Sequence, residues 1–304
     1  MKEFVEFRIN MEYAHLLFRD DEGTNLGDSV KVVRIDKNAP RFNAIGDLQK
    51  KARENNDLFF TCFDYRRSYT ETEINNAKWF LMFRTRHFEP TGEECGTIYD
   101  ESSACPICGS GAKQLSPLKL KRSSIPKADM AESIAWGDET IVSERFVNMV
   151  KDNNLKGMDF EPVISSANRG QKLNYYQVRP QCYLDFSKKT VFGQNPFDLS
   201  GKFPGCTLEG VQPDGTLVKK VIPPEIYKCP NGDNMGLRIL SEVYIKTSPI
   251  LDDLDFFASK QTVGGRGGVI RQHHLFFCSN RMMRLIKENN LKGFKFEVAH
   301  IVDE

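Results

Sequence analysis

The amino-acid sequence predicts an α+β protein, built from a degenerate tandem repeat of strand–helix–strand units with antiparallel or mixed sheets and a cysteine knuckle inserted in them. Three observations lead to this fold class. Of the 304 residues, 40% are hydrophobic and 27% are charged, which is typical of a globular protein with a buried core. Two segments of similar sequence follow one another along the chain, and a pair of closely spaced cysteines precedes the first of them.

The N-terminal part of the chain is expected to form a mixed α/β segment. Val5, Phe7 and Ile9 alternate with polar residues, and this period of two predicts a half-buried strand. Runs rich in β-branched and aromatic residues predict further strands, and a polar stretch predicts a short helix. These strands are expected at 30–35, 57–63 and 78–84, and the helix at 44–56.

The two similar segments cover 143–161 and 279–297, and they align without a gap. The residues that coincide are a serine, an arginine, a lysine, the run Asn-Asn-Leu-Lys-Gly, a phenylalanine and a glutamate. Each copy has a serine at the position of a helix N-cap, then an amphipathic helix, then paired asparagines that can end it in the left-handed conformation. We therefore expect two equivalent strand–helix–strand units, with helices at 144–153 and 280–289.

The repeat continues upstream with lower similarity. The Cys-Pro pair at Cys105 corresponds to the one at Cys229, and Asp129 corresponds to Asp252. The residues between the copies contain frequent Gly, Pro and Asn turn signals, which favour short strands and loops. The chain is thus expected to have four parts: an N-terminal mixed α/β segment (1–90), a first repeat with the knuckle (91–163), a loop-rich β connection (164–228) and a second, degenerate repeat (229–304).

The first Cys-Pro pair belongs to a CPxCG knuckle formed by Cys105 and Cys108. Thiolates three positions apart can hold one metal ion, and Cys95 brings a third thiolate within 14 residues, so the sequence predicts one tetrahedral zinc site. His87 is the nearest candidate for the fourth ligand, and Cys62 is the alternative thiolate. Four protein ligands leave no open position for a substrate or an activated water, so the predicted role of the zinc is structural.

Two other interpretations of the knuckle stay open. The second copy keeps Cys229 but lacks the second cysteine, so we interpret Cys229 as a relic, and the first knuckle could equally be free of metal. A CxxC pair can also act in redox chemistry when its first cysteine begins a helix, whereas turn-forming residues surround this pair. Eight cysteines are too few for a disulfide scaffold, and the N-terminus resembles no secretory signal, so a cytoplasmic, reducing location is expected.

The charge balance and the motifs argue against several classes of function. Lys and Arg number 42 and Asp and Glu number 41, a formal net charge of +1, which gives no overall attraction to nucleic acid or an anionic membrane. The apolar runs are all much shorter than the roughly 20 residues of a membrane span. The sequence contains no Ser/His/Asp signature and no catalytic zinc pattern, so we expect a protein that is not an enzyme.

A glycine cluster at 264–268 is the candidate partner surface. It lacks the residue order of a P-loop or a dinucleotide site and lies between two predicted strands, which is typical of a hairpin tip. Arg266 and Arg271 are expected to be exposed there, and arginine is enriched among the strongest contacts of protein interfaces.

Two Cys-Pro units, each leading to a strand, a Ser-x-Arg helix and an Asn-Leu-x-Gly-x-x-Phe strand, together resemble the double-CXXCG motif proteins. Those proteins are similar to the SitI-type immunity proteins of bacterial polymorphic toxin systems. The matching stretches are 105–163 and 229–302, and the second motif departs from the pattern in reading Cys229-Pro-Asn-Gly-Asp. The resemblance implies a bacterial cytoplasmic protein that binds and neutralises a cognate protein toxin and does no chemistry.

Two other functions remain open from the sequence alone. Zinc knuckles also occur in nucleic-acid-binding proteins, and Lys119, Lys121 and Arg122 could form a small basic patch, so a nucleic-acid-binding or regulatory protein is the alternative. An enzyme with an unrecognised site is the third. A gene for a large toxin immediately upstream would favour the immunity function.

Overall fold

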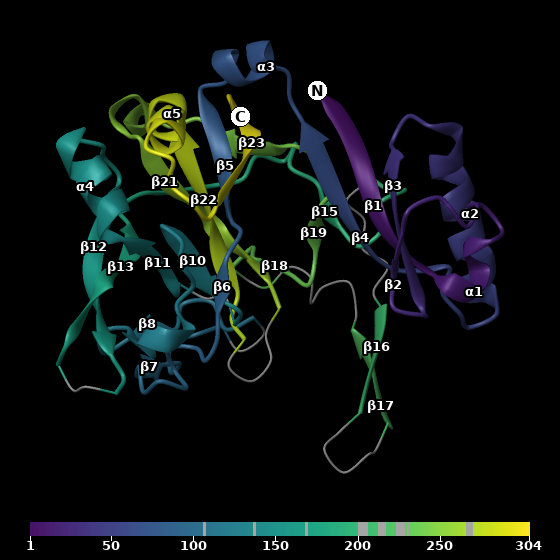
Figure 1. Cartoon of the computed structure of the whole chain (residues 1–304), viewed down its shortest axis with the longest axis horizontal. Coiled ribbons are helices and arrows are strands. Elements are labelled where there is room, and N and C mark those ends of the chain that lie inside the picture. The colour runs from purple at the N-terminus through teal and green to yellow at the C-terminus, as the bar shows by residue number, and fades with distance from the viewer. Residues whose placement is uncertain are drawn as a thin grey trace. The chain divides into compact units, whose positions relative to one another are not determined.

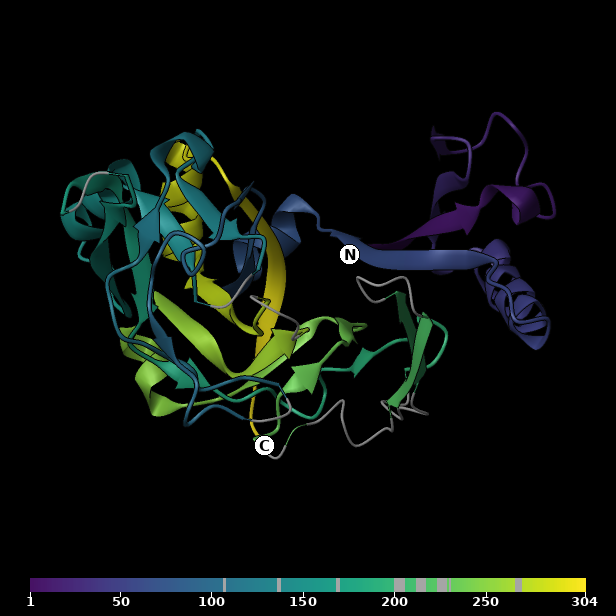
Figure 2. The ribbon, with the colours of Figure 1, turned by 90° about the horizontal axis from the view of Figure 1, so that it is seen from below.

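The computed structural model divides into two compact units, both made mainly of strands (Figures 1 and 2). The first unit combines residues 1–76 with 195–200, and the second combines 77–194 with 201–304. The described residues are 1–105, 108–135, 138–167, 170–199, 206–211, 217–222, 229, 231–265 and 270–304. The fold class is α+β, as predicted, and within these ranges no helix is long and apolar enough to cross a membrane.

The first unit is a four-stranded antiparallel sheet with the strand order β2-β3-β1-β4. Its strands are β1 (Lys2–Asn10), β2 (Thr24–Leu26), β3 (Val30–Asp36) and β4 (Phe60–Ser68). Its helices are α1 (Met11–Ala14), α2 (Pro40–Glu54) and α3 (Glu71–Asn76). The alternation that predicted β1 is confirmed, because Val5, Phe7 and Ile9 are all fully buried on one face of the sheet.

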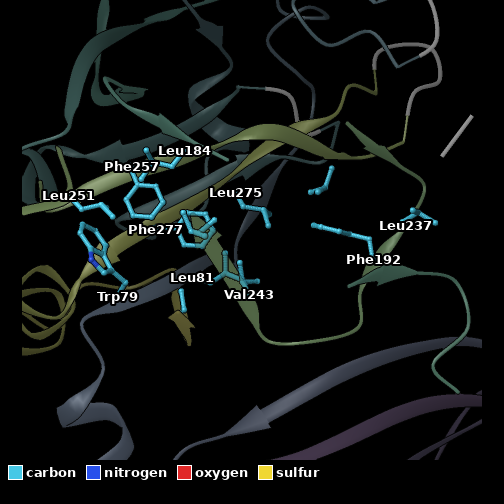
Figure 3. Close-up of a cluster of buried hydrophobic side chains, with 13 residues drawn as sticks. Trp79, Leu81, Leu184, Phe192, Leu237, Val243, Leu251, Phe257, Leu275 and Phe277 are labelled. Carbon is cyan, nitrogen blue, oxygen red and sulfur yellow. The ribbon is translucent and has the colours of Figure 1, made fainter. Parts of the chain in front are cut away.

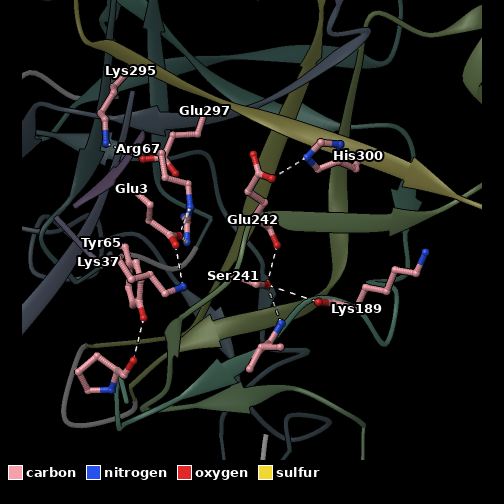
Figure 4. A network of polar contacts seen from close by, with 12 residues as sticks. Glu3, Lys37, Tyr65, Arg67, Lys189, Ser241, Glu242, Lys295, Glu297 and His300 are labelled. Carbon is pink, nitrogen blue, oxygen red and sulfur yellow. Dashed lines mark hydrogen bonds and ion pairs between the residues drawn. The ribbon is translucent and has the colours of Figure 1, made fainter. Parts of the chain in front are cut away.

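Phe197, which lies far along the chain, completes the core of the first unit. Its ring stacks on Phe7 with the ring centroids 6.0 Å apart, and it contacts Phe42 of α2 at 4.7 Å. The Tyr65 hydroxyl on β4 donates a hydrogen bond to the carbonyl of Pro196 at 3.0 Å (Figure 4). Aromatic side chains bury large apolar areas, so the core of the first unit depends on a segment that is distant in sequence.

A charged contact also connects the strands of the first unit. Glu3 and Arg67 face each other in the register of β1 and β4, and the Arg67 guanidinium donates to the Glu3 carboxylate at 2.9 Å. Lys37, just after β3, donates to the same carboxylate at 2.7 Å (Figure 4). Opposite charges that face each other across strands favour one register. Glu3 therefore helps to align β1, β3 and β4.

The second unit contains two larger sheets that mix parallel and antiparallel pairs. Their strand orders are β6-β10-β11-β13-β12-β9 and β14-β21-β22-β5-β23-β20, with β18 paired to β21. The first has β6 (His87–Phe88), β9 (Lys119–Leu120), β10 (Met130–Ser133), β11 (Thr140–Ser143), β12 (Met158–Ser165) and β13 (Lys172–Pro180). The second has β5 (Trp79–Arg84), β14 (Tyr183–Leu184), β18 (Asn234–Met235), β20 (Val243–Lys246), β21 (Phe256–Gly264), β22 (His273–Ser279) and β23 (Phe294–Val302).

Short elements connect these sheets. The helices are α4 (Glu144–Asp152) and α5 (Asn280–Glu288), with 3-10 turns at Arg122–Ser124 and Pro249–Asp253. Three small two-stranded ladders join β7 (Tyr99–Asp100) to β8 (Lys113–Gln114), β15 (Phe192–Gly193) to β19 (Arg238–Ile239) and β16 (Cys206–Val211) to β17 (Leu217–Ile222).

The core of the seven-stranded sheet combines aromatic and aliphatic side chains (Figure 3). Phe257 on β21 and Phe277 on β22 face each other and stack with their centroids 4.8 Å apart, and Trp79 packs edge-on against Phe257. Leu81 on β5 is the register partner of Phe277. The sequence predicts β5 as part of the N-terminal segment, but it lies between β22 and β23 and therefore belongs to the second unit.

Both helices predicted from the similar segments are present, and each lies between two strands. In each case the N-cap serine, Ser143 or Ser279, accepts a hydrogen bond from the backbone N–H three residues later, as the sequence predicts. Asn154 and Asn290 follow the helices with φ angles of 49° and 51°, the left-handed conformation that ends a helix. Figure 1 shows α4 and α5 next to each other at one end of the second unit.

Asp129 joins the start of α4 to the loop that follows α5. Its carboxylate accepts hydrogen bonds from the Ser143 hydroxyl at 2.7 Å and from the Lys292 backbone N–H at 2.8 Å. Arg145 lies 3.4 Å from the same carboxylate and also donates to the Asn289 carbonyl at 3.1 Å. Asp129 is buried, so these donors replace the hydration that its carboxylate loses on folding.

Asp255 makes the matching contacts with the two copies exchanged: it joins the start of α5 to the loop that follows α4. Its carboxylate accepts hydrogen bonds from the Ser279 hydroxyl at 2.8 Å and from the Lys156 backbone N–H, in the loop after α4, at 3.2 Å. The sequence comparison assigned this place to Asp252, and that pairing was wrong. Three additional residues separate the proline from the aspartate in the second copy, and the 3-10 turn Pro249–Asp253 accommodates them.

Two glycines allow these loops to approach the facing strands. Gly157 has a φ of +112°, and a Cβ atom there would lie 1.9 Å from the Phe256 carbonyl oxygen. Gly293 has a φ of +103°, and its Cβ atom would lie 2.1 Å from the Met130 carbonyl oxygen. Both positions therefore exclude any side chain, for reasons of conformation and of space.

We expect Gly157→Ala and Gly293→Ala each to lower the free energy of unfolding by about 3–5 kcal/mol, through left-handed strain and overpacking against a backbone. Gly170→Ala is the matched control, because Gly170 has a φ of +81° but nothing lies within 4 Å of an added Cβ. The control should cost only about 1–2 kcal/mol. Urea unfolding measures all three, and equal costs would contradict the close approach.

Candidate metal centre

Three cysteines meet in the interior of the second unit. The Sγ atoms of Cys105, Cys108 and Cys229 all lie within 4.8 Å of one another. Their side chains are 7%, 0% and 4% exposed, respectively. Thiolate sulfur is a preferred ligand of zinc and other soft metal ions, so this group can hold a metal ion.

A tight turn presents the first two cysteines. The Cys105 N–H donates to the Ser110 carbonyl at 2.8 Å, and the Gly109 N–H donates to the Cys105 carbonyl at 2.8 Å. Gly109 has a φ of 75°, which glycine adopts without strain. The Ser110 N–H then points at the Cys108 sulfur, 3.5 Å away, as expected for a turn that supports a thiolate ligand.

A similar turn presents the third cysteine. The Gly232 N–H donates to the Cys229 carbonyl at 2.8 Å, and the Cys229 N–H donates to the Asp233 carbonyl at 3.2 Å. Gly232 has a φ of 82°. Met235 packs against the three cysteines. By these hydrogen bonds Gly232 matches Gly109 and Asp233 matches Ser110, so the second turn is one residue shorter than the first and lacks the second cysteine.

Burial disfavours the charged form of these thiols. It raises the pKa of Cys108 above its usual value and raises the pKa of Cys229 to about 12. In the absence of a cation both groups are neutral at pH 7. A bound metal ion reverses this balance, because a coordinating thiol loses its proton.

The structure brings together a different set of residues from the predicted one. Of the predicted ligands, only Cys105 and Cys108 are in the group. Cys95 is half-buried in the turn that begins at Thr91, where its N–H donates to the Thr91 carbonyl at 3.0 Å. His87, on β6, lies 3.6 Å from Glu132, and the alternative ligand Cys62 lies on β4 in the first unit.

Cys229 is the member of the cysteine group that the sequence interpretation missed. The Cys-Pro pair repeated at Cys229 was the available signal, but the missing second thiol led us to interpret it as a relic. The prediction then took candidates close to the first knuckle in sequence. In the folded unit the nearest third thiol comes instead from a turn 124 residues after Cys105.

The structure describes only one of the two arginines of the predicted partner surface. Arg266 lies outside the described residues. Arg271 is described, and its side chain is only 12% exposed, because its guanidinium pairs with Glu93 at 2.7 Å and Glu101 at 2.9 Å. The guanidinium also lies 4.6 Å from the centroid of the Tyr99 ring, in a cation–π contact. Arg271 therefore holds the segment around β7 in place.

If the group holds zinc, Cys229→Ser is expected to reduce the bound zinc well below one ion per chain and to lower the Tm by about 5–10 °C, because metal-binding free energy contributes to folding. Cys95→Ser is the control and should change neither quantity. Elemental analysis and thermal unfolding of the full chain provide the two readouts. A zinc content that depends on Cys95 and not on Cys229 would restore the predicted set.

The comparisons with known proteins identify no relative. No protein-family model matches the chain, and no curated protein matches it at a significant level. The interpretation of the cysteine group therefore rests on its own geometry.

Proposed function

We propose that the chain is a non-catalytic protein of the immunity type, which binds a cognate protein toxin and is stabilised by one structural zinc ion. The observation that carries the structural role of the zinc is the burial of the cysteine group, in which Cys108 is 0% exposed, whereas toxin binding is proposed from the resemblance of the two Cys-Pro units to SitI-type immunity proteins. An ion enclosed at that depth is out of reach of a macromolecular substrate. Its binding free energy would contribute to the stability of the second unit.

The same proposal includes a tandem repeat that arose by duplication. Asp129 and Asp255 each contact the serine at the start of one helix and the loop after the other helix. Gly157 and Gly293 each approach a strand of the opposite copy. Reciprocal contacts of this kind are expected from two copies of one unit that pack around an approximate two-fold axis.

The best-supported contact surface lies beside the β7–β8 ladder. Ile98 is 55% exposed and Leu115 is 63% exposed, and the Leu115 N–H donates to the Ile98 carbonyl at 2.8 Å. A depression of about 440 Å³ adjoins them, lined by residues that include Leu115, Pro162 and Ile164. Neighbouring large apolar side chains on a surface are typical of protein–protein interfaces.

Charged side chains border this depression. Lys172 and Arg179 of β13 line it, and Arg179 pairs with Glu161 at 2.9 Å. An apolar centre with a charged rim is the usual anatomy of an interface, and Lys172 and Arg179 suit an acidic surface on the toxin. Both residues belong to the 164–228 connection.

To test this surface, we expect the double variant Ile98→Asp/Leu115→Asp to weaken binding of the toxin encoded beside the gene by roughly tenfold or more, because a charge would be buried at the interface. Ile250→Asp is the matched control, since Ile250 is 47% exposed in the 3-10 turn Pro249–Asp253. Calorimetric titration and urea unfolding separate lost binding from lost folding.

Two other results would change the proposal. Unchanged affinity of the double variant would remove this surface but leave the immunity function. Failure of the unmodified protein to bind the toxin at micromolar concentration, together with salt-sensitive binding of RNA or DNA, would favour the nucleic-acid-binding alternative.

A further inference from the structure

The carboxylate of Asp233 lies directly beside the three cysteines. Its Oδ2 atom is 3.2 Å from the Cys229 Sγ atom and 3.5 Å from the Cys108 Sγ atom. Asp233 is only 3% exposed. A buried carboxylate in contact with two thiols therefore has to be included in any account of the metal centre.

These distances match the edges of a tetrahedral zinc site. With Zn–S bonds of about 2.3 Å and Zn–O bonds of about 2.0 Å, an oxygen and a sulfur ligand lie about 3.5 Å apart, and two sulfur ligands lie about 3.8 Å apart. The two Oδ2–Sγ distances, 3.2 Å to Cys229 and 3.5 Å to Cys108, are close to this length. The three Sγ atoms, all within 4.8 Å of one another, need only small movements to reach it.

The Cys229 and Cys108 thiols donate hydrogen bonds to Oδ2 over these distances, and two further hydrogen bonds hold the carboxylate in this position. The Thr262 backbone N–H, on β21, donates to Oδ1 at 2.7 Å, and the Ser110 hydroxyl donates to Oδ2 at 2.6 Å. Outer-shell hydrogen bonds of this kind orient a ligand before the metal binds. Oδ1 is thus engaged with the strand, and Oδ2 is the oxygen directed toward the sulfurs.

The other polar group at this position is less suitable as a ligand. The Ser110 hydroxyl lies 3.1 Å from the Cys108 sulfur, but the protein side chains that bind zinc are those of cysteine, histidine, aspartate and glutamate. The described residues of the group include no histidine. The carboxylate is the remaining donor of a type that zinc accepts.

We infer that Asp233 is the fourth ligand, so that the metal centre is a Cys₃Asp site formed by Cys105, Cys108, Cys229 and Asp233. This inference rests on the proposed structural zinc. It also accounts for the departure of the second Cys-Pro turn from the CPxCG pattern: the shorter turn has no residue that matches Cys108, and Asp233 supplies an oxygen ligand instead.

The proposed site links three segments of the second unit. Cys105 and Cys108 belong to the first turn, and Cys229 and Asp233 belong to the second. Through the hydrogen bond from Thr262 to Asp233, β21 is connected to the ion as well. Zinc would displace one proton from each of the three thiols, whereas the ionised carboxylate has none to release.

X-ray absorption of the zinc-loaded full chain tests the ligand set directly. We expect three sulfur atoms and one oxygen atom around the ion in the unmodified protein, and four sulfur atoms in Asp233→Cys. With Co²⁺ in place of zinc, the thiolate-to-metal charge-transfer absorption should rise by about one third in Asp233→Cys, because a fourth thiolate joins three. His87→Ala and Cys95→Ser are the controls and should leave both spectra unchanged.

Metal affinity supplies an independent readout. Competition with a chromophoric chelator should show zinc binding weakened about 10–100-fold in Asp233→Asn, which keeps the side-chain shape and an oxygen for the Thr262 hydrogen bond but loses the anionic ligand. Circular dichroism of the zinc-loaded variant confirms that it is folded. If Asp233→Asn fails to fold, the Asp233→Cys spectra decide the question.

The outcomes separate this inference from the proposed function. Three sulfurs with a histidine nitrogen, or unchanged spectra and affinity in the Asp233 variants, would overturn Asp233 as a ligand but leave the structural zinc. If the unmodified protein binds zinc no more tightly than the Cys229→Ser variant does, both the metal centre and the Cys₃Asp site are wrong.

Discussion

The second unit depends on two buried carboxylates, Asp129 and Asp255, which each need donors from both halves of the unit. A buried carboxylate without partners is costly, and removing one partner from such a group is more damaging than replacing the whole group. Each carboxylate obtains a serine hydroxyl from its own half and a backbone N–H from the loop of the other half. Movement of either loop therefore removes one donor from a buried carboxylate, which couples the two halves of the unit energetically.

The cysteine group adds a second connection of the same kind at another place in the same unit. Its thiols come from two turns that are distant in sequence, as the aspartate contacts do. The aspartates are satisfied by hydrogen bonds and by one arginine each, whereas burial raises the pKa values of Cys108 and Cys229, which gain a charged form only with a cation. The aspartate contacts between the two halves are thus present with or without a metal ion. The contact through the cysteine group would be strong only when a metal ion is bound.

Local features were predictable from the sequence, and long-range ones were not. The alternation around Phe7 and the capping by Ser143 and Ser279 depend on neighbouring residues, and both are confirmed. Which cysteines come together depends on the turns that the sheets bring close to one another, so a choice of candidates near Cys105 in sequence missed Cys229. The place of β5 between β22 and β23 is set by pairing across about 200 residues, which no local pattern encodes.

The position of Phe197 has a consequence for synthesis of the chain. The continuous part of the first unit ends at residue 76. The core of this unit is complete only when Phe197 has also been synthesised. At roughly 5–20 residues per second, a ribosome needs about 6–24 s to make the intervening residues. During that interval Phe7 and Phe42 lack one of their aromatic neighbours, so the first unit begins to form early but reaches its native packing late. The order of translation and the order of folding therefore differ in this chain.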